Sequence, residues 1–140
     1  MVEAVWAIVR QENRFLLAQK SVVSNISGAW MFPCGEVDPT KSTHIDAASR
    51  VLEEEVGLKG EQFKKLCILH MDQYRISVFL CGNWSGGLKP THRDIIGIGW
   101  FTISEMHSLN QSLSPFVNSS LSYLSYLVQH YDHNPDQWKE

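Results

Sequence analysis

The sequence predicts an α/β protein in which strands and helices combine into one mixed β-sheet clasped between helices. Three observations support this fold class. Short apolar runs typical of strands precede and follow residues 44–56, which carry the end signals of a helix. Glycine and proline separate these runs. Near the C-terminus, apolar residues recur roughly at helical spacing, namely Phe116, Leu121, Leu124 and Leu127. The expected order of elements is β-β-β-α-β-β-β-α-α.

The N-terminal segment predicts a β-hairpin followed by a third strand. Residues 4–10 and 14–20 are apolar runs on either side of a short polar stretch, which is typical of a hairpin. Residues 21–28 are polar and predict a loop. Residues 29–32 then form a short strand, and Pro33 ends it.

The first helix has clear signals at both ends. Residues 38–42 have the composition of a turn, and Thr43 is a suitable N-cap. The helix is expected to run from about His44 to Val56, with Gly57 just beyond its end.

The second half predicts three further strands and two helices. Residues 63–71 and 74–84 are strand-like, and residues 95–102 form another strand. Ser104 is expected to cap a short helix, and Pro115 is expected to open the last one.

Composition limits the possible classes of protein. A chain of 140 residues suits one domain, residues 1–140, with a substantial core. A net charge of −3 without a basic stripe argues against nucleic acid as a partner, and no apolar run is long enough to span a membrane. The three cysteines form no C-x-x-C pair, so we expect free thiols in a soluble, cytoplasmic protein. Whether it is a homodimer is left open.

The segment from Gly35 to Leu58 contains a recognisable motif. It resembles the Nudix box, G-x5-E-x7-R-E-U-x-E-E-x-G-U, in which U is aliphatic. The matching positions are Gly35, Arg50, Leu52, Glu54, Glu55, Gly57 and Leu58. The flanking residues 30–36, 84–90 and 99–106 also resemble passages of that family. The resemblance implies a Nudix-type α/β/α sandwich with a mixed central sheet, and metal-dependent hydrolysis of a diphosphate linkage.

The box departs from the family pattern at several positions. Lys41 stands where its first glutamate belongs, and Val51 replaces the glutamate after the arginine. The intervening loop is one residue longer than in the pattern, and Cys34 replaces a glycine of the flanking motif. The expected carboxylate cluster is therefore reduced to two members.

The resemblance assigns the surviving helix residues to metal binding and catalysis. Glu54 and Glu55 would hold Mg²⁺ or Mn²⁺, and Arg50 would orient them. At about 100° per residue on a helix, these two glutamates are neighbours and Val51 lies between them in angle. The simpler interpretation is a solvated acidic face, with an ion pair between Arg50 and Glu54 at i,i+4 spacing.

Other residues are candidates for assisting this site. A backbone carbonyl at Cys34 or Gly35 could reach the metal, and Glu36 could supply a carboxylate. Lys20 could bind phosphate at the end of its strand, although a solvated edge lysine is equally natural there. Asp94 is the candidate for a further ligand or general base, in the loop before residues 95–102.

Two hypotheses about function follow. In the first, the protein is a Nudix pyrophosphohydrolase acting on a small-molecule nucleotide, either a nucleoside diphosphate derivative or a (d)NTP. In the second, it is a catalytically inactive Nudix domain that binds a nucleotide or a protein partner. The joint survival of Glu54, Glu55 and Arg50 favours the enzyme.

Overall fold

The structure is a computed structural model that describes residues 1–23 and 26–133. Its first elements are β1 (Val2–Gln11), β2 (Arg14–Val23), β3 (Ile26–Met31), β4 (Cys34–Glu36) and α1 (His44–Val56). The remaining elements are β5 (Lys59–Met71), β6 (Tyr74–Ser85), β7 (Ile95–Phe101), α2 (Ile103–Ser108), the 3₁₀ helix η1 (Asn110–Ser112) and α3 (Pro115–His133).

Within the described residues the strands form one seven-stranded sheet, which splits into two parts at the β1–β2 hairpin. Strand β1 pairs in parallel with β6 and antiparallel with β4, and β5 pairs antiparallel with β6. Strand β2 pairs antiparallel with both β3 and β7. Strands β1 and β2 share only two paired positions, Arg10↔Phe15 and Gln11↔Arg14. The parallel and antiparallel pairings confirm the mixed sheet expected from the sequence.

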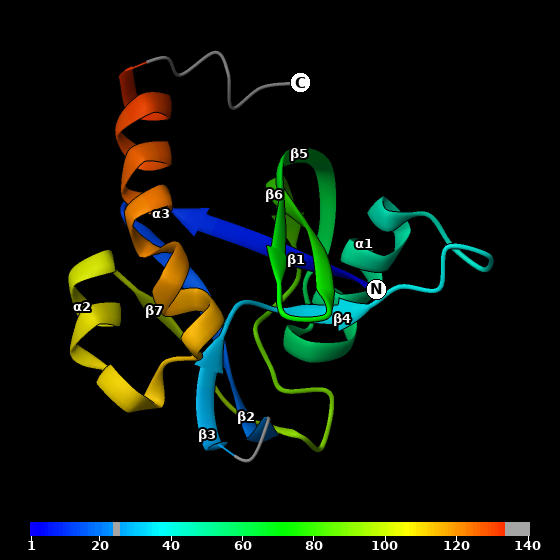
Figure 1. Cartoon of the computed structure of the whole chain (residues 1–140), viewed down its shortest axis with the longest axis horizontal. Helices are drawn as coiled ribbons and strands as arrows, with labels where there is room; N and C mark the ends of the chain where they lie inside the picture. The colour runs from blue at the N-terminus through cyan, green and yellow to red at the C-terminus, as the bar shows by residue number, and fades with distance from the viewer. Residues whose placement is uncertain (24–25, 134–140) are drawn as a thin grey trace.

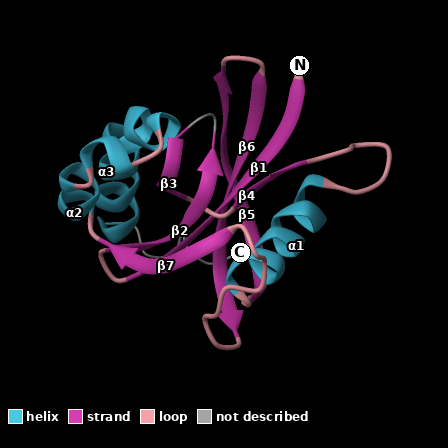
Figure 2. Ribbon diagram, turned by 90° about the horizontal axis from the view of Figure 1, so that it is seen from below, coloured by secondary structure: helices cyan, strands magenta, loops and turns pink. Residues whose placement is uncertain are grey.

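Helices cover both sides of the strands. Helix α1 lies on one side, whereas α2 and α3 lie on the other (Figures 1 and 2). Strand β1 contributes to the core on both faces of the sheet because its side chains point alternately to one face and the other. Its residues Ala4, Trp6 and Ile8 belong to one buried apolar cluster, and Val5, Ala7 and Val9 belong to the other. The α/β fold class is therefore confirmed.

The ends of α1 agree with the sequence prediction. The Thr43 hydroxyl oxygen accepts a hydrogen bond from the Asp46 backbone N–H at 3.1 Å. Gly57 has a left-handed backbone with φ 80°, and its N–H donates to the Glu53 carbonyl at 3.2 Å. These two ends fix which turn of the helix carries the acidic residues.

The structure corrects three predictions. The polar loop expected at residues 21–28 is largely strand, because β2 and β3 continue pairing through Val22↔Ser27 and Val23↔Ile26. Residues 24–25 lie outside the described part of the chain. Ser104 lies within α2 instead of capping it, because Thr102 and Glu105 form a capping box there. Strand β4 and helix η1 were not predicted.

Helix α3 begins at Pro115 as expected. Its residues Leu121 and Leu124 are buried against the cluster that contains Trp6, whereas the side chain of Leu127 lies outside the described ones. None of the helices in the described part of the chain has the length and apolar character needed to span a bilayer.

Candidate active site

Three chain segments bring a lysine, a glutamate and a cysteine together at one point. Lys20 comes from β2, Cys34 begins β4, and Glu55 lies on the last turn of α1. The Lys20 Nζ lies 3.0 Å from Glu55 Oε2, 3.4 Å from Cys34 Sγ and 3.5 Å from the Cys34 carbonyl oxygen. The Cys34 backbone N–H donates to Glu55 Oε1 at 3.4 Å. We call these three residues the Lys20 cluster.

The Lys20 cluster is largely shielded from water, and this shifts its proton equilibria. The side chains of Lys20 and Glu55 are 17% and 14% exposed. Burial raises the pKa of the Glu55 carboxyl, although Lys20 and the Cys34 N–H act in the opposite direction. Burial also raises the pKa of the Cys34 thiol. Burial opposes the charge on Lys20, but Cys34 and Glu55 outweigh it, so that the pKa of the ammonium is raised.

A cavity of about 460 Å³ adjoins the Lys20 cluster. Lys20 and Cys34 form part of its wall, together with Gly35 and Glu36. The remaining wall is mostly apolar and includes Trp6, Met31, Tyr74 and Phe116. This volume is within the range of small-molecule sites. Charged residues beside an aromatic wall suit a ligand that has both a charged group and a flat apolar group.

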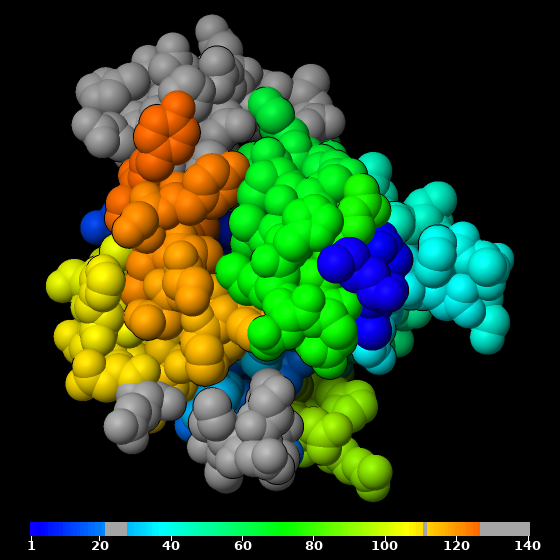
Figure 3. Space-filling view, in the orientation of Figure 1, coloured from blue at the N-terminus to red at the C-terminus, as the bar shows by residue number. Residues whose placement is uncertain are grey.

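The aromatic wall joins the β5–β6 hairpin to α3. The rings of Tyr74 and Phe116 lie 6.0 Å apart at 67°, and the side chains of α3 lie beside the hairpin on this face (Figure 3). A bridge between Trp30 and Leu113 ties the segment before α3 to β3. Tyr74 lines the cavity, whereas Trp30 packs against Phe101 with their ring centroids 4.9 Å apart.

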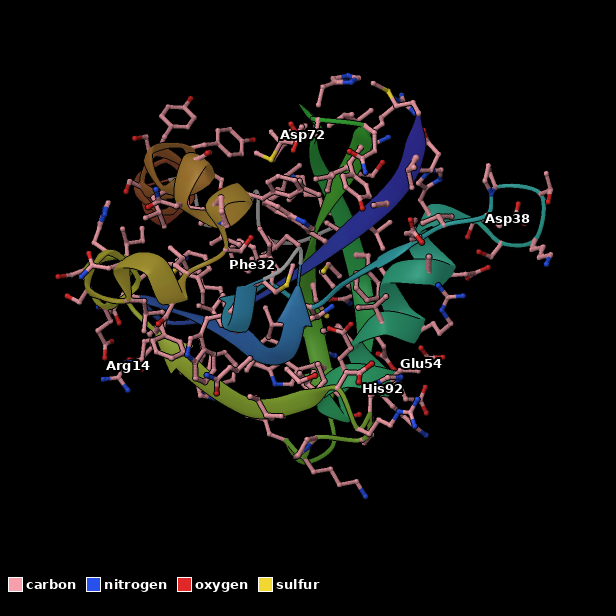
Figure 4. All side chains as sticks on the ribbon, turned by 60° about the horizontal axis from the view of Figure 1, so that its bottom comes forward. Arg14, Phe32, Asp38, Glu54, Asp72 and His92 are labelled. Carbon is pink, nitrogen blue, oxygen red and sulfur yellow. The ribbon has the colours of Figure 1, made fainter. Side chains whose placement is uncertain are left out.

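Glu54 does not join the Lys20 cluster. Its side chain is exposed and lines a separate, shallower hollow with Arg50, Thr91 and His92. The Thr91 hydroxyl donates a hydrogen bond to the Glu54 carbonyl oxygen. Glu54 and His92 lie next to each other (Figure 4). Neighbouring positions on α1 thus face different surroundings, because successive residues of a helix differ by about 100° in direction.

Arg50 contacts the end of β4 instead of a carboxylate of the box. Its guanidinium donates to the Glu36 carbonyl oxygen at 3.3 Å. No ion pair between Arg50 and Glu54 occurs among the described contacts. Arg50 therefore holds the backbone of Glu36, and Glu36 lines the cavity.

The loop before β7 contributes His92 instead of Asp94 to the surroundings of α1. Asp94 is exposed and does not line the hollow, and its Oδ2 lies 3.5 Å from His92 Nδ1. Proximity to His92 slightly opposes the rise in the pKa of the Glu55 carboxyl that burial causes. No motif in the sequence distinguishes His92, and its only signal is its place in the loop that contains Asp94.

The two altered positions of the box have different surroundings. Val51 is 3% exposed and belongs to the buried cluster under α1. A Cβ atom on Gly35 would lie only 2.8 Å from Val51 Cγ2, so only glycine fits there without displacing Val51. The side chain of Lys41 is 81% exposed, with Nζ 4.0 Å from Asp38 Oδ2. Asp38 lies on a loop that extends away from Glu54 (Figure 4).

The described side chains include no group of three or more His, Cys, Asp and Glu residues that could hold a metal ion. The oxygen atoms that do converge are those of Glu55 and the Cys34 carbonyl, and they converge on a cation, the Lys20 ammonium. Mg²⁺ and Mn²⁺ prefer oxygen ligands, and these oxygens are already arranged around a positive charge.

Comparison with known proteins shows what this chain resembles in sequence and in fold. The NUDIX domain family matches residues 2–120. The CTP pyrophosphohydrolase of Escherichia coli (strain K12) is 39% identical over 60 residues, which are 43% of this chain and 44% of that protein. The chain thus matches less than half the length of this relative.

Two solved structures are similar to this chain over most of their length. The MutT NUDIX hydrolase from Burkholderia pseudomallei has a TM-score of 0.74 and 26% identity, covering 86% of this chain and 95% of that one. The E. coli ORF135 protein has a TM-score of 0.75 and 23% identity, covering 91% and 90%.

A mixed sheet between helices, a box on α1 and a family match over residues 2–120 define the class of this protein. The chain belongs to the Nudix family, which confirms the resemblance to that family expected from the sequence.

Proposed function

We propose that the protein is a metal-dependent Nudix pyrophosphohydrolase that cleaves the diphosphate linkage of a nucleoside diphosphate derivative or a (d)NTP. The observation that carries the proposal is the cavity of about 460 Å³ with the Lys20 cluster at one end and aromatic side chains on its wall. A nucleotide has the matching character, with phosphates at one end and a flat base at the other.

In this proposal Glu55 and the Cys34 carbonyl are the central metal ligands, with Glu36 assisting, whereas Glu54 lines the separate hollow. Mg²⁺ is commonly held by only one or two carboxylates, with substrate phosphates and water completing its coordination, so the small donor set fits a weakly held ion. When bound, such an ion would neutralise phosphate charge and make a water molecule nucleophilic at neutral pH.

The side chains of this chain would supply the remaining functions. Lys20 lines the cavity and would bind a phosphate oxygen as a point charge. Tyr74 and Phe116 would hold the base by stacking and exclude water from the apolar part of the cavity. Arg50 would keep the Glu36 backbone, and with it strand β4, in position. Asp94 stays a candidate general base, and His92 is a second candidate because it lies beside Glu54.

The test is a screen of nucleotides with Mg²⁺ and Mn²⁺ that measures release of phosphate or pyrophosphate. CTP is the first substrate to try because the relative from E. coli is a CTP pyrophosphohydrolase. We expect Glu55→Gln to lower turnover by at least a hundredfold. Glu61→Gln, which alters an exposed carboxylate of β5, serves as the control and should leave turnover unchanged.

One observation favours the alternative function, a binding module without catalysis. Val51 is part of the core, so one glutamate of the box is replaced by a residue that cannot hold metal. If nucleotides bind in the cavity but no tested nucleotide is hydrolysed with either metal, the alternative replaces the first proposal. The three free cysteines, Cys34, Cys67 and Cys81, are compatible with the reducing cytoplasm that we propose as its location.

A further inference from the structure

The Lys20 ammonium occupies the position to which the oxygen donors of the site are directed. It lies 3.0 Å from Glu55 Oε2 and 3.5 Å from the Cys34 carbonyl oxygen, and its side chain is mostly shielded from water. These two oxygens are the central metal ligands proposed above. A divalent ion and an ammonium group cannot both approach them, because two cations within a few ångströms repel each other strongly in a partly buried site.

The second oxygen of the carboxylate is also engaged. Glu55 Oε1 accepts a hydrogen bond from the Cys34 backbone N–H at 3.4 Å. Glu55 is therefore held from both sides, by the backbone of β4 and by the side chain of Lys20. A metal ion that binds Glu55 at Oε2 has to take the place of Lys20.

The cavity gives the Lys20 side chain a second position when it is displaced from Glu55. Its side chain forms part of the cavity wall as well as of the ion pair, so its ammonium can turn toward the cavity without leaving β2. A phosphate group in the cavity would give the displaced ammonium a new anionic partner. Without such a group, displacement leaves the charge of a partly buried lysine uncompensated.

We propose that Lys20 is an internal counter-ion that competes with the divalent metal for Glu55 and the Cys34 carbonyl, and that the substrate phosphate removes this competition by accepting the displaced ammonium. The inference rests on the proposed function. Lys20 would then couple the binding of the metal to the binding of the nucleotide. Metal alone binds weakly, metal and nucleotide strengthen each other, and by linkage the coupling factor is the same in both directions.

The test measures Mn²⁺ binding by calorimetry, without turnover, in the presence and absence of the non-hydrolysable analogue α,β-methylene CTP. Lys20→Met keeps most of the side-chain length and removes the charge. We expect it to bind Mn²⁺ alone at least tenfold more tightly than the unmodified protein. We also expect the analogue to tighten Mn²⁺ binding by a smaller factor in this variant than in the unmodified protein.

Two variants serve as matched controls. Lys41→Met removes a positive charge from an exposed loop residue and should leave Mn²⁺ affinity unchanged. Lys20→Arg keeps the charge and should bind Mn²⁺ as weakly as the unmodified protein. If Lys20→Met fails to fold, as judged by circular dichroism, Lys20→Gln removes the charge while retaining a hydrogen-bond donor for Glu55, and the same tightening is expected.

The possible results separate the inference from the proposed function. Equal Mn²⁺ affinity in Lys20→Met and in the unmodified protein, combined with loss of binding in Glu55→Gln, overturns the inference and leaves the metal site in place. Absence of Mn²⁺ binding in every variant, with and without the analogue, overturns the metal site itself and the inference with it.

Discussion

Val51 shows how one residue changes the character of a site. It is 3% exposed and packs in the core under α1, in contact with the backbone at Gly35. A glutamate at this position would complete the family pattern, but in this chain it would place a carboxylate among apolar side chains. The question is therefore whether position 51 still belongs to the site or to the core.

We predict that Val51→Glu destabilises the metal-free protein by at least about 2 kcal/mol, because an ionised carboxylate would be buried without a partner. Urea unfolding monitored by tryptophan fluorescence measures this directly. Val51→Ala, which only removes methyl groups, should cost less than the charged variant. An unaltered free energy of unfolding for Val51→Glu would mean that the new side chain reaches solvent or the site.

Glu54 and Glu55 should respond differently to the same substitution. Glu55→Gln removes the charged partner of Lys20, so we expect the metal-free protein to lose about 1.5–3 kcal/mol of stability. Glu54→Gln alters an exposed side chain and should change stability by less than about 0.5 kcal/mol. Thermal unfolding in the presence of a chelator measures both. Equal losses in the two variants would contradict the separate environments described for these residues.

At the scale of elements, the end of α1 depends on one backbone conformation. Gly57 has φ 80°, and a Cβ atom there would lie 3.0 Å from the Gly87 carbonyl oxygen. We predict that Gly57→Ala destabilises the protein by about 1–3 kcal/mol, from backbone strain and this close contact. Gly87→Ala is the matched control, because no atom lies within 4 Å of its added Cβ. The difference between their melting temperatures is the measurement, and similar values would rule out strain at Gly57.

Three elements meet at Glu3 of β1. Its carboxylate accepts hydrogen bonds from His44 of α1 at 3.0 Å and Arg75 of β6 at 3.1 Å. The hydrogen bond with His44, followed by the charge of Arg75, lowers the pKa of Glu3 below its ordinary value of 4.5. A lowered carboxyl pKa stabilises the fold above the unfolded-state value, and this contribution is lost as the pH falls through the folded-state pKa.

We therefore predict that Glu3→Gln is less stable than the unmodified protein at pH 7 and that the gap narrows below pH 4.5. Denaturant unfolding of both proteins across this range measures the gap, and subtracting the two curves removes the effects of other carboxylates. A gap of constant size down to the acid limit would show that Glu3 contributes by something other than its charge.

The elements that the sequence predicted well are those with local signals. Helix α1 could be predicted from Thr43 and Gly57 because caps are set by neighbouring residues. Strand β4 could not, since its three residues become a strand only through pairing with β1. The continuation of β2 and β3 through Val22↔Ser27 likewise depends on the partner strand. Such tertiary pairing leaves no periodic pattern in a short polar segment.

In the candidate site, too, local patterns predict some features, whereas others depend on tertiary contacts. The box could be found from spacing along α1, and Lys20 from its place at the end of the predicted second strand, although β2 continues to Val23. The ion pair between Lys20 and Glu55 joins residues on different elements, and no pattern in the sequence contains it. The separation of Glu54 from Glu55 and the proximity of His92 to Glu54 likewise required the three-dimensional arrangement.

For the whole molecule, stability depends on two apolar clusters on opposite sides of the strands. Helix α3 closes one of them with Leu121, which is 2% exposed. We predict that Leu121→Ala costs about 2–5 kcal/mol in the free energy of unfolding, from lost burial and the resulting cavity. Leu88→Ala, at a side chain that is 39% exposed, should cost much less. Chemical denaturation measures both, and similar losses would mean that α3 does not seal this cluster.

The parallel pairing of β1 with β6 has a consequence for biosynthesis. The register joins Val2 to Tyr74 and Val9 to Cys81, so the paired residues are separated by about 70 positions in the chain. At roughly 5–20 residues per second, the ribosome needs several seconds to produce β6 after β1 has been made. During that interval the apolar residues of β1 lack their central partner, and the edge of β1 that will pair with β6 is open to other chains. The nascent protein therefore depends on early shielding of its first strand, and slower translation between the two strands should lower the yield of folded protein.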